Sequence, residues 1–160
     1  MKYRRLTNAE LAELETEFVR FLAAQSIPAD DWEKIKNTDP ARTNQLLDKF
    51  SEVVFEKVIA NLQYLEFRTP KDIKTFYCEE DQIHLIGLSA SGETDLDFTK
   101  NPSRAELMQQ FQNQQAQLQI YHAQKGYQPD RKTELFRMME SGALIAQDGG
   151  MYKILKQFVE

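Results

Sequence analysis

Residues Lys71–Leu88 read KDIKTFYCEEDQIHLIGL, and this stretch decides the fold that we predict. Its first half alternates between two faces, with Ile73, Thr75 and Tyr77 on one of them, which is the spacing of a strand. The polar turn Glu79–Gln82 leads into a more continuously apolar run that is typical of an interior strand. Because an isolated hairpin is only marginally stable in water, we expect helices from the rest of the chain to cover it.

Strand spacing also precedes the hairpin, where Leu65 and Phe67 fall on one face. The sequence therefore predicts a three-stranded antiparallel meander with strands over about residues 62–69, 72–78 and 83–89. The alternative is that the preceding helix continues through Tyr64 and Leu65, which leaves a sheet of two strands.

Helical spacing of apolar residues predicts five to six helices packed on this meander, and hence an α+β fold. The expected helices span about residues 8–25, 29–36, 40–61, 102–124, 130–141 and 151–159. The first begins with a capping box of Thr7 and Glu10, and the third begins at Pro40, a residue suited to the first helical position. For the last segment, a terminal hairpin across Asp148-Gly149 is the competing interpretation.

Length and composition predict the class of protein. A chain of 160 residues fits one globular domain over residues 1–160. The net charge of -5 disfavours a nucleic-acid partner, since lysine and arginine drive non-specific binding to phosphates. One cysteine fits a reducing compartment. The N-terminus lacks the apolar core of a signal peptide, and no apolar run approaches the ~20 residues of a membrane helix, so we expect a cytoplasmic protein without membrane contact.

Residues with catalytic or ligand-binding chemistry are few. The sequence has no zinc spacing, no phosphate-binding loop and no nucleophile motif, so we name no catalytic residue, no metal ligand and no cofactor. A pocket between sheet and helices would hold Tyr77, Cys78 and His84, and we expect His84 to approach Cys78 across the hairpin because these two residues lie near a shared turn. A buried structural thiol is nevertheless the preferred interpretation of Cys78. We interpret the acids Glu79–Asp81 as a solvated turn rather than a cation site.

The N-terminal arm is the most concentrated basic cluster in the chain and is our first candidate for partner binding. It comprises Lys2, Tyr3, Arg4 and Arg5, and arginine offers forked donors that suit carboxylates and phosphates. The competing interpretation is that the arm pairs with acids of its own chain.

A glutamine-rich segment is the second candidate for partner binding. On the helix expected over 102–124, Gln112, Gln115 and Gln119 belong to a polar face without strong charge repulsion. This face packs on a partner or on a second copy of the chain, or it simply faces solvent.

Three functions follow, in order of preference. The first is a non-enzymatic interaction or adaptor protein with an unidentified protein partner, a homodimer being one option. The second is a small-ligand-binding protein or enzyme that uses the pocket between sheet and helices. The third is an RNA or ribosome accessory factor that uses the basic arm.

Two segments carry a resemblance to a known family. They are MKYRRLT over Met1–Thr7, and PKDIKTF over Pro70–Phe76 continuing to IHLIG over Ile83–Gly87. Together they resemble a family of small uncharacterised proteins from Bacteroidetes, over most of the chain and less clearly toward the C-terminus. The resemblance implies a bacterial cytoplasmic protein and brings no activity, ligand or site residue with it.

Overall fold

The computed structural model describes residues 2–113 and 116–159 and divides into two compact units, Met1–Ala60 and Asn61–Glu160. The predicted α+β class is confirmed. The single globular domain stays a prediction, because the positions of the two units relative to one another are not determined.

The first unit is helical and consists of α1 (Asn8–Glu13), α2 (Glu15–Ala24), α3 (Ala29–Thr38) and α4 (Pro40–Asn61) up to Ala60. The predicted helix over residues 8–25 is wrong in one respect, since it breaks at Leu14. There φ is -105° and ψ is 23°, and the Leu14 N–H donates to the carbonyls of both Glu10 and Leu11. The helix therefore ends in a tight turn before α2 begins.

Aromatic packing holds the first unit together. The Phe18 ring lies 5.1 Å from the Trp32 ring, edge to face, and 4.9 Å from the Phe50 ring. Leu22 and Leu46 are buried beneath these rings. Aromatic pairs at such distances add to the stabilisation from apolar burial, so these helices have a core of their own.

The second unit is built on a five-stranded antiparallel sheet of order β4-β3-β2-β1-β5, in which the predicted three-stranded meander forms the centre. The strands are β1 (Tyr64–Thr69), β2 (Asp72–Cys78), β3 (Gln82–Gly92), β4 (Ala116–Gly126) and β5 (Leu144–Ile145). A sheet of only three strands was wrong, because β4 and β5 extend both edges. The alternative of a helix continuing past residue 64 was also wrong.

The helices of the second unit are α5 (Arg104–Gln112), α6 (Arg131–Glu140) and α7 (Gly150–Val159), with the short 3₁₀ helix η1 (Phe98–Lys100) before α5. The helix predicted over residues 102–124 was wrong beyond α5, because residues 116–126 pair with β3 along its whole length. At the C-terminus the helical prediction is confirmed, and the alternative of a terminal hairpin was wrong.

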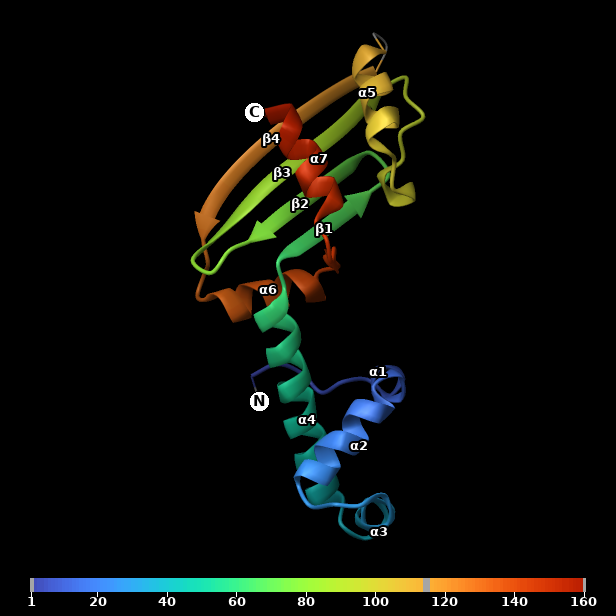
Figure 1. Cartoon of the computed structure of the whole chain (residues 1–160), viewed down its shortest axis with the longest axis vertical. Coiled ribbons are helices and arrows are strands. Elements are labelled where there is room, and N and C mark those ends of the chain that lie inside the picture. Colours follow the sequence, from blue (N-terminus) through green and yellow to red (C-terminus); the bar gives the residue numbers. More distant parts are fainter. Residues whose placement is uncertain (1, 114–115, 160) are drawn as a thin grey trace. The chain divides into compact units, whose positions relative to one another are not determined.

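The two faces of the sheet differ in their covering. Figure 1 shows α7 lying across one face, with α5 beside it. On this α7 face, Ile73, Ile86 and Leu88 pack against Leu107 of α5 and Leu155 of α7, and all five are buried. The opposite face carries the alternate residues of each strand, and α6 packs at one end of it.

Candidate functional site

The free edge of β4 is the most distinctive surface of the second unit. Among the described strands, only β3 is hydrogen-bonded to β4, in an unbroken register from Gln82↔Gly126 to Gly92↔Ala116. The outer side of the strand therefore presents a row of backbone donors and acceptors over eleven residues. The other edge of the sheet, β5, is only two residues long.

The β4 edge lacks the features with which proteins usually prevent strand pairing. It contains no proline and no bulge, and Lys125 is its only charged residue. The Lys125 ammonium lies 2.7 Å from the Glu134 carboxylate of α6, so this charge is paired. The edge is therefore long, uninterrupted and nearly neutral.

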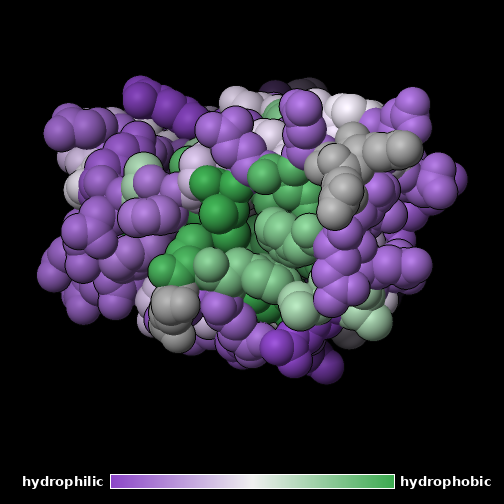
Figure 2. All heavy atoms as spheres, turned by 90° about the horizontal axis from the view of Figure 1, so that it is seen from above, coloured by the Kyte–Doolittle hydropathy of each residue, from purple (hydrophilic) through white to green (hydrophobic). Residues whose placement is uncertain are grey.

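An apolar surface adjoins this edge on the α7 face. It consists of Met108 and Phe111 of α5 and Phe158 and Val159 of α7, and the Phe111 and Phe158 rings lie 4.8 Å apart. Met108, Phe111 and Val159 are 40%, 39% and 36% exposed. Figure 2 shows an apolar area, green, enclosed by hydrophilic side chains. Contiguous apolar surface of this kind marks interaction sites more often than isolated exposed residues do.

A groove of about 540 Å³ borders the second half of β4. Its walls include His122 and Gln124 of β4, His84 of β3, and Tyr152 and Lys156 of α7. Several donors and one ammonium group thus converge on a hollow with an apolar floor, an arrangement that suits binding of a polar or anionic group.

His84 is held in a fixed orientation within this groove. Its Nε2 lies 2.5 Å from Glu79 Oε2, and the Tyr77 ring stacks on the imidazole at 5.8 Å. The hydrogen bond from His84 lowers the pKa of Glu79, and Gln82 adds a second bond to the same carboxylate. A carboxylate that orients a histidine is one part of an acid–base site, but no serine or cysteine completes a nucleophilic arrangement among the residues that line the described groove.

Cys78 lies apart from the other two residues of the predicted pocket. Tyr77 pairs with His84, and Cys78 pairs with Ile83, so the thiol projects from the opposite face of the sheet. Cys78 is buried, and desolvation raises the pKa of its thiol to about 12 although Arg131 acts in the other direction. A neutral buried thiol is not a nucleophile at physiological pH.

The opposite face holds a polar cluster that the sequence did not predict. Asp72 accepts hydrogen bonds from Tyr121 Oη at 2.6 Å and Ser89 Oγ at 2.9 Å, and Lys74 Nζ lies 2.8 Å from its other oxygen. Burial acts to raise the pKa of Asp72, but the hydrogen bonds from Lys74, Tyr121 and Ser89 outweigh it and lower the pKa. Since these side chains are hydrogen-bonded and ion-paired to one another, we interpret the cluster as structural.

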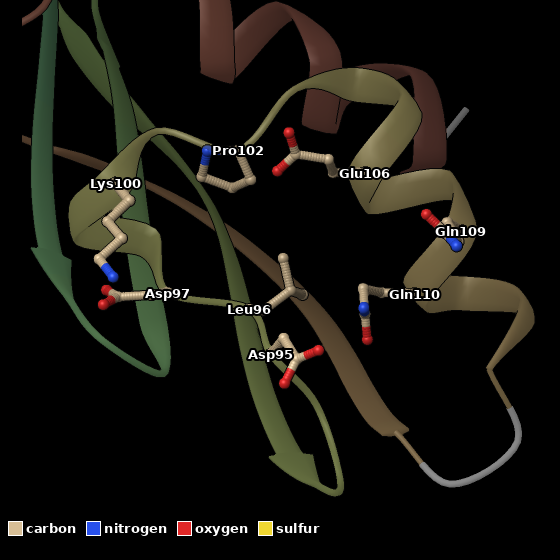
Figure 3. Close-up of a pocket in the computed structure, with 8 residues that line it drawn as sticks. All are labelled: Asp95, Leu96, Asp97, Lys100, Pro102, Glu106, Gln109 and Gln110. Atoms are coloured by element: carbon tan, nitrogen blue, oxygen red, sulfur yellow. The ribbon is translucent and has the colours of Figure 1, made fainter.

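A smaller pocket of about 230 Å³ lies between α5 and the segment around η1 (Figure 3). Glu106 and Gln110 project from α5, and Asp95, Asp97 and Lys100 come from the other wall. Asp97 caps η1 by accepting hydrogen bonds from the Thr99 N–H and hydroxyl, which lower its pKa. Within residues 2–113 and 116–159, no group of three or more acids, histidines or cysteines is placed to hold a metal ion.

The N-terminal arm pairs with acids of its own unit, which is the competing interpretation of its basic cluster. Each cation of the arm has an acidic partner: Lys2 with Glu56 at 3.2 Å, Arg4 with Glu10 at 2.8 Å, and Arg5 with Asp48 at 2.7 Å. The Tyr3 ring lies 5.5 Å from that of Phe55. The arm is thus fastened along α4 and α1.

The three glutamines expected on one helix face do not share a helix. Gln112 is the last residue of α5. Gln119 lies in β4 and is exposed on the face of the sheet that points away from α7. Gln115 lies outside the described residues. The signal that sequence reasoning missed was the alternation of Gln117, Leu118, Gln119 and Ile120, which has the period of a strand.

Comparison with known proteins identifies a family whose function is unknown. The matching family model spans residues 1–160 and describes a family of unknown function. Neither the curated proteins nor the solved structures include a match. In the described part of the chain, every helix is too short or too polar to cross a membrane.

Proposed function

This chain belongs to the Family of unknown function (DUF6495), and we propose that it works as a non-enzymatic protein-interaction module whose binding surface is the free edge of β4 together with the adjoining apolar surface. The single observation that carries the proposal is an edge strand of eleven residues without a proline or a bulge, whose one charged side chain, Lys125, is paired with Glu134. Proteins that recognise extended segments add a strand to such an edge, and main-chain hydrogen bonds supply the affinity.

The apolar surface supports the same proposal from a second direction. Met108, Phe111 and Val159 are each more than one third exposed although Leu107 and Leu155 beside them are fully buried. Covering the exposed side chains contributes roughly 25 cal/mol for each Å² of apolar area removed from water. A partner that pairs with β4 on the α7 side therefore gains both hydrogen bonds and apolar burial.

A site-specific photocrosslinking experiment tests this function. A photoreactive residue replaces Gln119 on β4, and the matched control carries it at Gln147, which is also exposed and follows β5 at the other edge. We expect a defined covalent adduct from residue 119 in living cells and none from residue 147. Equal labelling from both positions, or none from either, overturns the proposal.

A small-ligand or enzymatic role of the groove is the second candidate, and the oriented His84–Glu79 pair favours it. Such a ligand would contact His84, His122 and Lys156. A panel of metabolites assayed by thermal shift tests this role, with His122→Ala as the variant that must lose the shift. Unchanged melting across the panel argues against it.

An RNA-binding role for the arm is the least favoured candidate, because Lys2, Arg4 and Arg5 already neutralise carboxylates. Co-sedimentation with RNA at moderate salt is the corresponding test. A cytoplasmic location and an origin in Bacteroidetes belong to the same proposal. The lone cysteine and the resemblance over residues 1–7 and 70–87 support them.

A further inference from the structure

We propose that the occupant of the β4 edge is a second copy of this chain, with the two β4 strands pairing antiparallel to join both sheets into one of ten strands. The proposal rests on the proposed function and deepens it by naming the partner. It assigns a two-fold axis that passes through the sheet near Tyr121, at the middle of β4.

The edge has the length and regularity that self-pairing needs. Eleven residues of extended chain span roughly 35 Å. Every neighbouring pair in this sheet is antiparallel, and a two-fold axis pairs a strand with its own copy in the same sense. The proposed pairing between the two β4 strands is therefore antiparallel, like every pairing within the sheet.

Charge favours contact between two copies at this edge. The chain carries a net charge of -5, so most surfaces of two copies repel each other weakly. The β4 edge contains no acid, and its Lys125 is paired with Glu134. With the axis at Tyr121, Lys125 of one copy lies opposite Gln117 of the other and Gln119 opposite Ala123, so no like charges meet.

The geometry of the sheet also limits the assembly to two copies. Once β4 is paired, the joined sheet ends at β5 on both sides. That strand has only two residues, and a very short edge does not template further pairing. Self-pairing through β4 thus closes as a dimer and does not extend into a filament.

The apolar surface gains cover in the same arrangement. The apolar surface runs from α5, which contacts β4, to Val159, which also lines the groove along the second half of β4. Antiparallel pairing sets the first half of one strand against the second half of the other, so the α5 end of each apolar surface lies next to the groove of its partner. The pairing of the two strands thereby adds apolar contact to the backbone hydrogen bonds, as stable interfaces do.

Charges introduced at two exposed, neutral positions of the edge test the proposal. One variant carries Gln119→Lys with Ala123→Lys, and the other carries Gln119→Glu with Ala123→Glu; both positions are exposed. Sedimentation measures self-association of each protein alone and of the two variants mixed. We expect the wild type to dimerise, each variant alone to have a dissociation constant raised at least about tenfold by like charges facing each other, and the mixture to recover the dimer.

Controls separate this result from unfolding and from failure of the proposed function. A double variant with Gln63→Lys and Gln147→Lys adds the same charge at exposed sites near β1 and β5, away from β4, and should dimerise like the wild type. Circular dichroism verifies that each variant folds. A monomeric wild type, or a mixture that does not associate, overturns the dimer. If residue 119 then still crosslinks to a different protein, the interaction function survives and only the second copy is lost.

Discussion

The Tyr121 ring lies over Gly87, its partner in the β3–β4 ladder, so closely that no larger residue fits beneath it. A β-carbon added at residue 87 would stand 2.1 Å from Tyr121 Cζ. The glycine leaves room for a ring whose hydroxyl donates a 2.6 Å hydrogen bond to Asp72. With the ring in this place, only glycine fits at position 87.

Gly87→Ala should destabilise the second unit by displacing the Tyr121 ring. We expect the free energy of unfolding to fall by about 1–3 kcal/mol, the usual cost of overpacking, because the displaced hydroxyl also loses Asp72. Urea unfolding followed by near-ultraviolet circular dichroism, to which the tyrosines contribute, measures this. In a Tyr121→Ala background the same substitution should be nearly neutral, since no ring remains to be moved.

Gly126→Ala is the matched control in the same sheet. Its added β-carbon would come no closer than 3.9 Å to another atom, the Asp81 carbonyl oxygen, which is ordinary contact. An equal cost of Gly87→Ala with and without the Tyr121 ring would show that the close approach is not the cause.

Arg131 should be the most sensitive position of α6, because its guanidinium holds the ends of two strands. It donates to the Leu62 carbonyl at 2.6 Å, to the Cys78 carbonyl at 3.3 Å and to the Glu79 carbonyl at 3.1 Å. Arg131→Ala leaves these acceptors without the guanidinium, and we expect a loss of about 2–3 kcal/mol in urea unfolding. Arg131→Lys should recover only part of this, since an ammonium cannot span three acceptors in a fork.

Arg137 provides the comparison, since it is another arginine of α6 and is exposed. Arg137→Ala should lower the free energy of unfolding by no more than about 1 kcal/mol, the usual limit for a surface charge in the last turn of a helix. Similar losses at both positions would contradict the role assigned to the Arg131 guanidinium.

The central hairpin was predictable because its information is local. Alternation at Ile73, Thr75 and Tyr77 specifies a strand whatever the chain does elsewhere, and the turn at Glu79–Gln82 brings the next strand alongside. The helix α7 was predictable for the same reason, since Met151, Leu155 and Phe158 repeat at helical spacing.

The strand β4 was not predictable from the same kind of signal. Leu107, Phe111 and Leu118 fit a helix, whereas Leu118 and Ile120 among glutamines fit a strand. Pairing with the whole length of β3 decides between them, and that partner is far away in sequence. Local preference yields to such long-range contacts, so the free edge became visible only in the folded chain.

The residues of the predicted pocket show how register limits sequence reasoning. His84 was expected to approach Cys78, but His84 pairs with Tyr77 and stacks on its ring. Side chains alternate along a strand, so Cys78, the residue after Tyr77, projects from the other face. Proximity to a shared turn predicts neighbours in the chain and does not by itself predict a shared face.

Cys78 should resist thiol reagents in the native protein. Burial raises the pKa of its thiol to about 12, so the thiolate fraction at neutral pH is very small, and the sulfur is also inaccessible. Labelling with an aromatic disulfide reagent should be slow in buffer and complete in urea. A Cys78→Ala/Gln147→Cys variant, with its thiol at an exposed position, should react at once in buffer. Rapid labelling of the native wild type would contradict the assignment.

Glu10 should make the stability of the first unit depend on pH in the acid range. The hydrogen bond from Arg4, reinforced by those from Thr7, lowers the pKa of Glu10 from 4.5 to about 2. Because the pKa is lower in the folded state, the stabilisation is present above the unfolded value of 4.5 and disappears as pH falls toward 2. The partly exposed pair contributes at most about 1 kcal/mol, and salt reduces it further.

Fluorescence of Trp32, which packs on Phe18 inside the first unit, measures this effect in urea unfolding at a series of pH values. Glu10→Gln keeps an oxygen that accepts from the Thr7 N–H but removes the charge that faces Arg4. The difference between wild type and variant should be greatest near neutral pH and should vanish by about pH 2, while Glu13→Gln on the same helix is the charge-matched control. A difference that stays constant from pH 7 to pH 2 would mean that Glu10 acts through its shape and capping alone, not through its charge.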